Sequence, residues 1–201
     1  MNVGVFGGTF DPVHIGHLII AEEARVRLKL SVVLFVPAGQ PWLKVDHAIT
    51  PVLDRVEMLR RSIANNPCFK LSTIEVDRPG PSYTVDTIAS LRDELGAQSF
   101  FFILGSDSLG GLPSWKQPGR LVQLCQLVVV PRLGVNPPDL GAFASSIPGL
   151  MDRVTWLDAP VIGVSSSEIR ERVARGLPIR YLVPEEVGKY IVERRLYEKQ
   201  S

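Results

Sequence analysis

One stretch near the N-terminus constrains the fold more than any other, and it reads Gly7-Gly8-Thr9-Phe10-Asp11-Pro12-Val13-His14-Ile15-Gly16-His17. It follows the short, apolar and β-prone residues 3–6, and after it Ile20, Ala24 and Leu28 recur every four positions, as on one face of a helix. The pattern predicts a strand, a glycine turn and a helix in direct succession. Glycines let a backbone approach a bulky anion, and the free N–H groups of a helix start favour negative charge. We expect this turn to bind phosphate.

Two histidines, His14 and His17, stand three residues apart at the start of the predicted helix. At this spacing both imidazoles can face one point and donate hydrogen bonds to the oxygens of one phosphate. For either histidine alone, a structural role as a helix cap is the alternative. The pair also supplies two possible zinc ligands, but no cysteine or carboxylate cluster nearby offers the others. We interpret the pair as phosphate ligands and expect no metal ion held by protein side chains.

The overall composition excludes several classes of partner. With 201 residues, of which 45% are hydrophobic, and no linker or repeat, we expect a single domain over residues 1–201 with a good core. A formal net charge of +1 gives no global reason to bind nucleic acid or a membrane surface. No signal segment is recognisable and no apolar run approaches the roughly 20 residues that span a bilayer. Cys68 and Cys125 are isolated in the sequence, so we predict a reduced, cytoplasmic protein whose cysteines lie in the core.

Apolar segments alternate with helical patterns along the rest of the chain. Strands are predicted at residues 32–36, 69–76, 100–104, 127–130 and 154–157. Helices are predicted to begin at Thr50-Pro51, at Ser82 or Thr84, at Ser165 and at Pro184, and residues 134–149 are predicted to form a surface loop. This order predicts an α/β fold, a Rossmann-like, doubly wound and mostly parallel sheet with helices on both faces. Ligands of such sheets collect at the carboxyl ends of the strands.

Two of these helices have an assignable buried face. The helix after Thr50-Pro51 would bury Val52, Val56, Leu59 and Ile63 and would turn Arg55 and Arg61 to solvent. The helix after residue 84 would bury Val85, Ile88 and Leu95.

Three polar or aromatic residues follow predicted strands and are further candidates for the site. Lys44 could reach a phosphate from its loop, although a solvated lysine is the simpler reading. Asp107 could accept hydrogen bonds from ribose hydroxyls or help to hold a divalent ion, and Gly-Ser-Asp is also a helix-start signal. Trp115 could stack on a heterocycle or simply pack against the domain.

A second phosphate-binding pattern lies at residues 165–170, Ser-Ser-Ser-Glu-Ile-Arg. The serines and Glu168 have the order of a helix N-cap, and capping alone explains them. It does not explain Arg170, which one helical turn places near the same helix start. We expect the serines and Arg170 to hold phosphate together.

These motifs resemble a known family. The stretch at 7–17 and the run at 165–170 look like those of the nucleotidylyltransferases with an H-x-G-H motif. Further matching motifs make nearly the whole chain similar to the bacterial nicotinate-nucleotide adenylyltransferases. These motifs are Ser82-Tyr83-Thr84, Gly105-Ser106-Asp107, Leu112-Pro113-Ser114-Trp115-Lys116 and Tyr181-Leu182-Val183-Pro184. The chain lacks the G-x-G-x-x-G turn of hydride-transfer domains and the G-K-[ST] ending of a P-loop.

The resemblance implies an activity and a set of site residues. The 5′-phosphate of nicotinate mononucleotide would attack the α-phosphorus of ATP, giving nicotinate adenine dinucleotide and pyrophosphate in NAD biosynthesis, with Mg²⁺ carried by the ATP phosphates. The catalytic residues would be His14, His17, Arg170 and Lys44. The residues binding ATP would be Gly7, Gly8, Thr9, Phe10, Gly105, Asp107, Ser165 and Ser166. The residues binding the nicotinate nucleotide would be Thr84, Trp115, Tyr83 and Lys116.

The chain departs from many relatives at three places, and alternatives stay open. Pro41-Trp42-Leu43-Lys44 replaces Pro-Pro-His-Lys, Ser167 replaces Thr, and Arg132-Leu133-Gly134 replaces Arg-Pro-Gly. The first difference leaves Lys44 as the sole basic residue of that motif. A related enzyme could use nicotinamide mononucleotide or phosphopantetheine, and a non-catalytic protein could sense adenine nucleotides. The literal H-x-G-H also occurs in class I aminoacyl-tRNA synthetases, but the chain has no K-M-S-K-S loop. The oligomeric state stays open.

Overall fold

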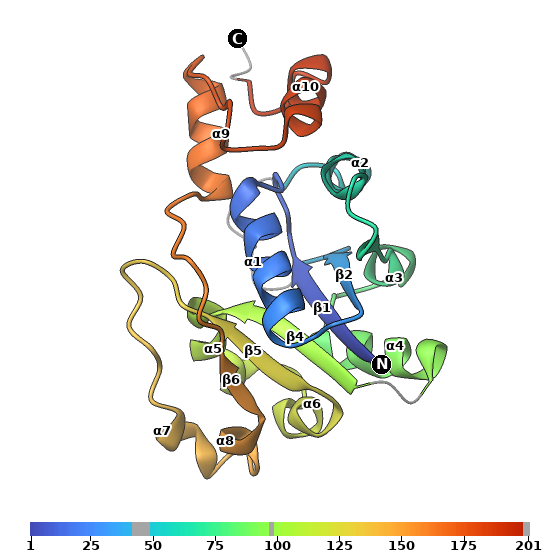
Figure 1. Cartoon of the computed structure of the whole chain (residues 1–201), viewed down its shortest axis with the longest axis vertical. Helices are drawn as coiled ribbons and strands as arrows, with labels where there is room; N and C mark the ends of the chain where they lie inside the picture. Colours follow the sequence, from blue (N-terminus) through green and yellow to red (C-terminus); the bar gives the residue numbers. More distant parts are fainter. Residues whose placement is uncertain (42–48, 97–98, 199–201) are drawn as a thin grey trace.

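The computed structural model describes residues 1–41, 49–96 and 99–198 and contains a six-stranded sheet in the order β3-β2-β1-β4-β5-β6 (Figure 1). All neighbouring strands in this sheet are parallel. The strands are β1 (Asn2–Gly8), β2 (Val32–Pro37), β3 (Phe69–Leu71), β4 (Ser99–Gly105), β5 (Gln126–Val130) and β6 (Val154–Trp156). The predicted α/β fold with a doubly wound parallel sheet is confirmed.

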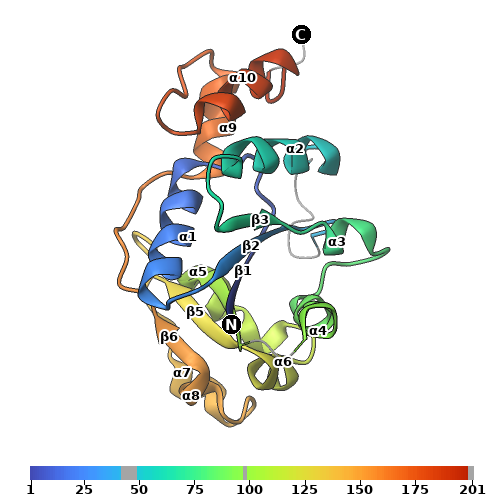
Figure 2. The same cartoon turned by 45° about the vertical axis from the view of Figure 1, so that its right-hand side comes forward.

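Helices cover both faces of the sheet (Figure 2). They are α1 (Ile15–Arg27), α2 (Val52–Ile63), α3 (Ile74–Asp77), α4 (Thr84–Leu95), α5 (Ser106–Gly110), the 3₁₀ turn η1 (Leu112–Ser114), α6 (Pro118–Leu124), α7 (Leu140–Ala144), α8 (Leu150–Arg153), α9 (Ser166–Ala174) and α10 (Glu185–Glu193). Among the described residues, no helix is long and apolar enough to cross a membrane.

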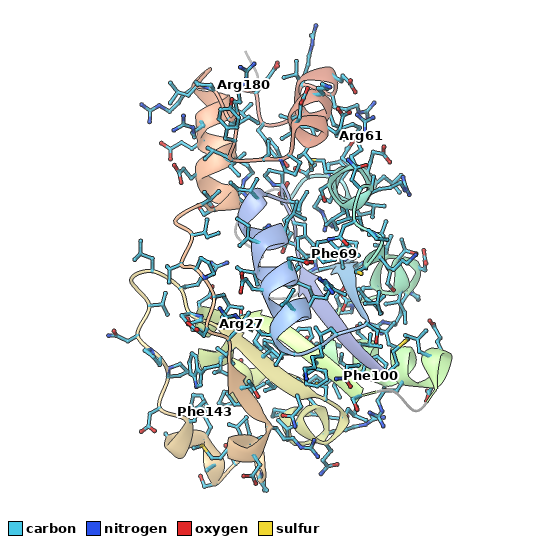
Figure 3. The ribbon with its side chains drawn as sticks, in the orientation of Figure 1. Arg27, Arg61, Phe69, Phe100, Phe143 and Arg180 are labelled. Atoms are coloured by element: carbon cyan, nitrogen blue, oxygen red, sulfur yellow. The ribbon has the colours of Figure 1, made fainter. Side chains whose placement is uncertain are left out.

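The core is divided between the two faces of the sheet. One apolar cluster contains buried residues of α1, α2 and α10, and the other contains buried residues of α4 and α6. Phe69 belongs to the first cluster and Phe100 to the second (Figure 3). Arg61, expected to face solvent, lies between α2 and α10, with its guanidinium carbon 4.5 Å from the centre of the Tyr190 ring. Because β1, β2 and β4 contribute residues to both clusters, their sequences read as continuous apolar runs.

The central strand β1 marks the point where the strand order reverses. Its neighbours are β2 on one side and β4 on the other, and β4 is followed outward by β5. In open α/β sheets, ligands bind outside the carboxyl ends of the strands at such a point. The turn after β1 and the residues after β4 and β5 therefore lie where a ligand site is expected.

The sequence prediction was wrong for part of residues 69–76. Only Phe69–Leu71 forms a strand, and Ile74–Asp77 is the short helix α3. The alternation of residue types suggested a longer strand, but one bond to α4 and one bond within this segment stabilise a helix instead. The carboxyl group of Glu75 turns inward to the Thr87 hydroxyl, and Thr73 Oγ1 donates to Asp77 Oδ2 at 2.7 Å.

Details of α4 also differ from the prediction. Tyr83 occupies the N-cap without a side-chain cap bond, and Ser82 bonds to a neighbouring loop. Leu91 is buried on the inner face, whereas Leu95 is largely exposed. Of the two cysteines predicted to be in the core, Cys125 is buried and Cys68 is half-buried.

Candidate active site

The start of α9 lies against the turn between β1 and α1 (Figures 1 and 2). Ser166 Oγ donates to the carbonyl oxygen of Pro12 at 2.9 Å, across 154 residues of sequence. Arg170 Nη1 donates to the carbonyl oxygen of Asp11 at 2.6 Å. Ser165 caps the helix by accepting a bond from the Glu168 amide at 3.2 Å, as its position predicted. The structure therefore brings together the two stretches that the sequence assigned to one phosphate site.

Arg55 supports the same turn from α2, which corrects the expectation that it faces solvent. Its side chain is 2% exposed. Nη1 donates to the Thr9 carbonyl at 2.8 Å and Nε to the Thr50 carbonyl at 3.0 Å. Burial lowers the pKa of the guanidinium, and the Asp11 carboxylate acts in the opposite direction. Helical periodicity could not show this, because one of the two carbonyls that satisfy Arg55, that of Thr9, belongs to a turn 46 residues away.

The buried carboxylate of Asp11 connects the turn to the C-terminal segment. Asp11 Oδ1 accepts a bond from the Tyr197 hydroxyl at 2.7 Å, and Oδ2 accepts one from the Thr50 amide at 3.2 Å. Burial raises the pKa of Tyr197, and the Asp11 carboxylate adds to this effect. Sequence reasoning missed Tyr197 completely, because nothing in its local pattern points to a partner 186 residues away.

The two histidines are stacked at the start of α1. Their ring centroids are 3.7 Å apart and their planes differ by 30°. The backbone amide of His14 donates to Nδ1 of His17 at 3.1 Å. Since Nδ1 accepts this bond, a neutral His17 carries its proton on Nε2. Gly16 leaves room for the pair, because a Cβ there would lie 3.0 Å from His14 Nδ1.

His14 is an uncharged, buried imidazole in the free protein. It is 5% exposed, and its Nδ1 atom has no hydrogen-bond partner within the described parts of the chain. Burial lowers the pKa of His14 to about 4, with a smaller contribution from the positive charge of Arg132. A nitrogen in this state can accept or donate a bond once an anionic ligand supplies the partner.

Asp107 and Arg132 form a second part of the site after β4 and β5. Arg132 Nη1 lies 3.3 Å from Asp107 Oδ2, and the pair is half-exposed. A Cβ at Gly105 would lie only 2.3 Å from Asp107 Oδ1, so a larger residue there would displace the Asp107 carboxylate. Asp107 lies in the first turn of α5. Arg132 was not predicted as a site residue, although its position directly after a strand was a usable signal.

A third part consists of Trp115 and Lys116 together with Tyr83 and Thr84 at the start of α4. We call these four residues the acceptor side. Lys116 Nζ lies 2.8 Å from Asp86 Oδ2 and 4.8 Å from the centre of the Tyr83 ring. Thr84 is the first residue of α4.

Trp115 links the acceptor side to the turn through Phe102. The Trp115 ring packs edge-on against Phe102, with centroids 6.2 Å apart. The Phe102 ring would lie 3.2 Å from a Cβ at Gly7. Within the described residues, the buried Nε1 of Trp115 has no hydrogen-bond partner. Trp115 therefore packs in the core and also keeps one donor available.

The donors around the turn suit an anion. Imidazoles, guanidinium groups and backbone amides at a helix start all favour negative charge. The described residues contain no group of three or more His, Cys, Asp or Glu side chains that could hold a metal ion. Lys44, predicted to contact phosphate, lies outside the described residues.

Comparison with known proteins identifies the family. A profile described as Cytidylyltransferase-like matches residues 5–172. A protein of Dehalococcoides mccartyi named as a probable nicotinate-nucleotide adenylyltransferase is 44% identical over 201 residues, covering 100% of this chain and 98% of its own. The chain belongs to the nicotinate-nucleotide adenylyltransferase family, within the Cytidylyltransferase-like group. A Roseiflexus relative of the same name is 46% identical over 195 residues and covers 97% of each chain.

Solved structures of adenylyltransferases share the fold. Plasmodium falciparum nicotinic acid mononucleotide adenylyltransferase complexed with NaAD superposes with a TM-score of 0.79 at 20% identity, covering 98% of this chain and 97% of that one. The same enzyme complexed with APC gives a TM-score of 0.77, with 98% and 96% covered. At this identity the likeness concerns the arrangement of the elements.

Proposed function

We propose that this protein transfers the adenylyl group of ATP to nicotinate mononucleotide, forming nicotinate adenine dinucleotide and pyrophosphate for NAD synthesis. The observation that carries the proposal is the stacked pair His14 and His17, held on a turn whose carbonyls bond to Ser166 and Arg170. Family members 41% to 46% identical to this chain carry the name of that activity, which supports the choice of acceptor.

The chemistry needs no nucleophile from the protein. An oxygen of the acceptor's 5′-phosphate forms the new bond to the α-phosphorus of ATP. The bond from that phosphorus to the bridging oxygen of the β-phosphate breaks, and pyrophosphate leaves with the bonding electrons. Such a transfer is accelerated mainly by positioning and by stabilising charge on the phosphate oxygens. His17 Nε2 would donate to an α-phosphate oxygen, and buried His14 would do so from beside it.

The turn and the start of α9 would hold the phosphates of ATP. Arg170 is oriented by its bonds to the Asp11 carbonyl and to Ser167 Oγ, and its other N–H groups would bind pyrophosphate. Ser165 and Ser166 stand at the N-terminus of the same helix, where an anion is favoured. The amides of the turn would contribute further donors. The proposed phosphate ligands are thus Gly7, Gly8, Thr9, Phe10, Ser165, Ser166, Arg170 and Lys44.

The two nucleosides would lie on opposite sides of the turn. We assign Gly105 and Asp107 to the adenosine. The nicotinate ring would stack on Trp115, with Tyr83, Thr84 and Lys116 around the rest of the nucleotide. The buried Nε1 of Trp115, which has no partner within the described residues, supports this assignment, because buried donors are normally satisfied and a ligand would supply the acceptor.

We propose that Mg²⁺ enters with ATP, bound to its phosphates, because the donors around the turn favour anions. When bound, the cation would reduce the negative charge of those phosphates. We further propose that the chain acts as a single domain in the cytoplasm, with these small molecules as its partners rather than nucleic acid or a membrane.

The test supplies the purified protein with ATP, Mg²⁺ and one of three acceptors, namely nicotinate mononucleotide, nicotinamide mononucleotide or phosphopantetheine. Pyrophosphate release and product mass are followed. We expect the fastest turnover with nicotinate mononucleotide. Preference for another acceptor would correct the substrate, and ATP binding without any product would instead support a nucleotide sensor.

A further inference from the structure

The buried carboxyl group of Glu75 lies at the centre of a hydrogen-bond cluster beneath the start of α4. Glu75, Ser82 and Thr87 are all buried. Thr87 Oγ1 donates to Glu75 Oε1 at 2.6 Å, and Arg78 Nη2 donates to Thr87 Oγ1 at 3.0 Å. Burial raises the pKa of Glu75, against the effect of these partners. None of these residues belongs to the phosphate site described above.

Ser82 lies beside this carboxyl group and binds the loop after β2. Its Oγ accepts bonds from the amides of Gly39 at 3.0 Å and Gln40 at 3.3 Å. The Ser82 hydroxyl is close enough to the Glu75 carboxyl to act against the rise of its pKa. The Ser82 amide donates to the Gln40 carbonyl at 3.1 Å. The loop after β2 is therefore fixed to the segment that leads into α4.

Residues 82–87 are thus held at both ends, at Ser82 by the amides of Gly39 and Gln40 and at Thr87 by the Glu75 carboxyl group. Tyr83 and Thr84 lie between the two bonded positions. The link extends to the phosphate turn, because the Ala38 amide donates to the Gly8 carbonyl at 2.9 Å. The loop is pressed onto α3, where a Cβ at Gly39 would lie 2.2 Å from the Glu75 carbonyl oxygen.

We propose that Glu75 is a positioning residue for the acceptor nucleotide, acting through Ser82 and Thr87 on the start of α4. This inference rests on the proposed function, which assigns Tyr83 and Thr84 to that nucleotide. Glu75 does not itself touch the substrate. Its loss shifts the acceptor side relative to the turn, while the residues that hold ATP keep their own supports from α2 and α9.

The test compares steady-state kinetics of Glu75→Gln, Ser82→Ala and Thr87→Val with the wild type. Glutamine keeps an oxygen that can accept from Thr87 but replaces the second carboxyl oxygen of the buried cluster with an N–H₂ donor. We expect KM for nicotinate mononucleotide to rise about tenfold in each variant, with KM for ATP and kcat changed by less than about threefold. Glu94→Gln, on the exposed side of α4, is the matched control and should behave as wild type.

Four results would overturn the inference. An unchanged KM for the acceptor in folded Glu75→Gln is one, and a parallel rise of both KM values is another, because it would indicate general loss of structure. If Glu75→Gln does not fold, the test uses Ser82→Ala and Thr87→Val. An unchanged KM for the acceptor in both of these variants would then overturn the inference. A wild-type protein that makes no product overturns the proposed function and this inference together, whereas an active wild type with silent variants overturns this inference alone.

Discussion

The phosphate turn (residues 7–17) and the acceptor side differ in how their groups are held. At the turn, the carbonyls of Thr9, Asp11 and Pro12 are bonded to side chains from α2 and α9. On the acceptor side, Lys116 pairs with Asp86 at the surface, and the buried Nε1 of Trp115 has no partner among the described residues. The backbone of the turn is therefore fixed by side chains from other elements before any ligand arrives, and His14 Nδ1 is the buried atom of the turn that lacks a partner among the described residues. On the acceptor side it is the side chains of Trp115 and Lys116 that a ligand would meet.

This difference fits the demands of the two substrates. Stabilising charge on a reacting phosphate requires donors that do not have to reorganise during the reaction. Recognition of an acceptor requires discrimination, which buried groups supply when only the correct ligand satisfies them. The comparison yields predictions that separate ATP-side effects from acceptor-side effects.

The largest effect is expected for His17→Ala. Loss of its Nε2–H donor should lower kcat by about 100-fold or more, while ATP binding persists. Rapid-quench kinetics and calorimetric titration with ATP measure the two quantities. A variant with wild-type kcat would assign His17 a purely structural role at the helix start.

The buried, neutral His14 should make stability depend on pH. Its folded pKa of about 4 lies below the unfolded value of 6.5, so the unfolded chain gains a proton first as the pH falls. The free energy of unfolding supplied by this group is therefore lost as the pH drops from 6.5 towards 4. Between pH 7 and pH 5 we expect His14 to lower the free energy of unfolding by about 2 kcal/mol.

Urea denaturation of the wild type and His14→Asn at both pH values measures this contribution. The variant should lose about 2 kcal/mol less than the wild type over this interval. Equal losses in the two proteins would mean that His14 is accessible to protons in the folded state.

Arg170→Lys should affect ATP rather than the acceptor. Lysine cannot bond to the Asp11 carbonyl and to phosphate with one planar group, so kcat/KM for ATP should fall about 20-fold. The control is Arg175→Lys, since Arg175 is exposed on the same helix and pairs only with Glu171 in the described structure. A fall in kcat/KM for nicotinate mononucleotide without a fall in kcat/KM for ATP would contradict the assignment of α9 to the phosphates of ATP.

Trp115→Phe should have the opposite selectivity. It removes the buried Nε1 donor and part of the stacking surface, so KM for nicotinate mononucleotide should rise about tenfold with little change in KM for ATP. Trp156→Phe, on the edge strand β6, is the control. If both tryptophan variants behave alike, Trp115 has only a packing role.

The smallest effect is expected for Tyr197→Phe. Removing the hydroxyl leaves the buried Asp11 carboxylate one bond short and should cost about 1 to 2 kcal/mol of unfolding free energy. The exposed Tyr181, which is 80% exposed, provides the control Tyr181→Phe. Thermal and urea denaturation measure the difference, and equal stability of the two variants would contradict a supporting role for Tyr197.

Local sequence predicted the parts of the site that depend on local backbone. The turn at 7–17 and the Ser165 cap follow from glycine, helix-start and capping preferences, which act within a few residues. Repeated apolar runs likewise predicted the parallel sheet, because each run is a local pattern of a few residues. Once the sheet is parallel, the carboxyl ends of its strands meet at one edge, which is why distant candidates came together.

Supports that act across the chain could not be predicted in this way. Arg55 resembles any surface arginine on a helix until the Thr9 carbonyl of the turn is placed beside it. Glu75 fits an alternating strand pattern, yet it turns inward to Thr87 from a short helix. In both cases a buried polar group is stabilised by a partner from another element, and no local pattern encodes that partner.

The most direct test of the central claim follows the oxygens of the acceptor phosphate. Nicotinate mononucleotide with a heavy oxygen isotope in its phosphate is incubated with the protein, Mg²⁺ and unlabelled ATP. The masses of the products are then measured by mass spectrometry. Attack by this phosphate on the α-phosphorus predicts a dinucleotide that retains all of the label and pyrophosphate that contains none. Label in the pyrophosphate, or no dinucleotide at all, would contradict adenylyl transfer at this turn.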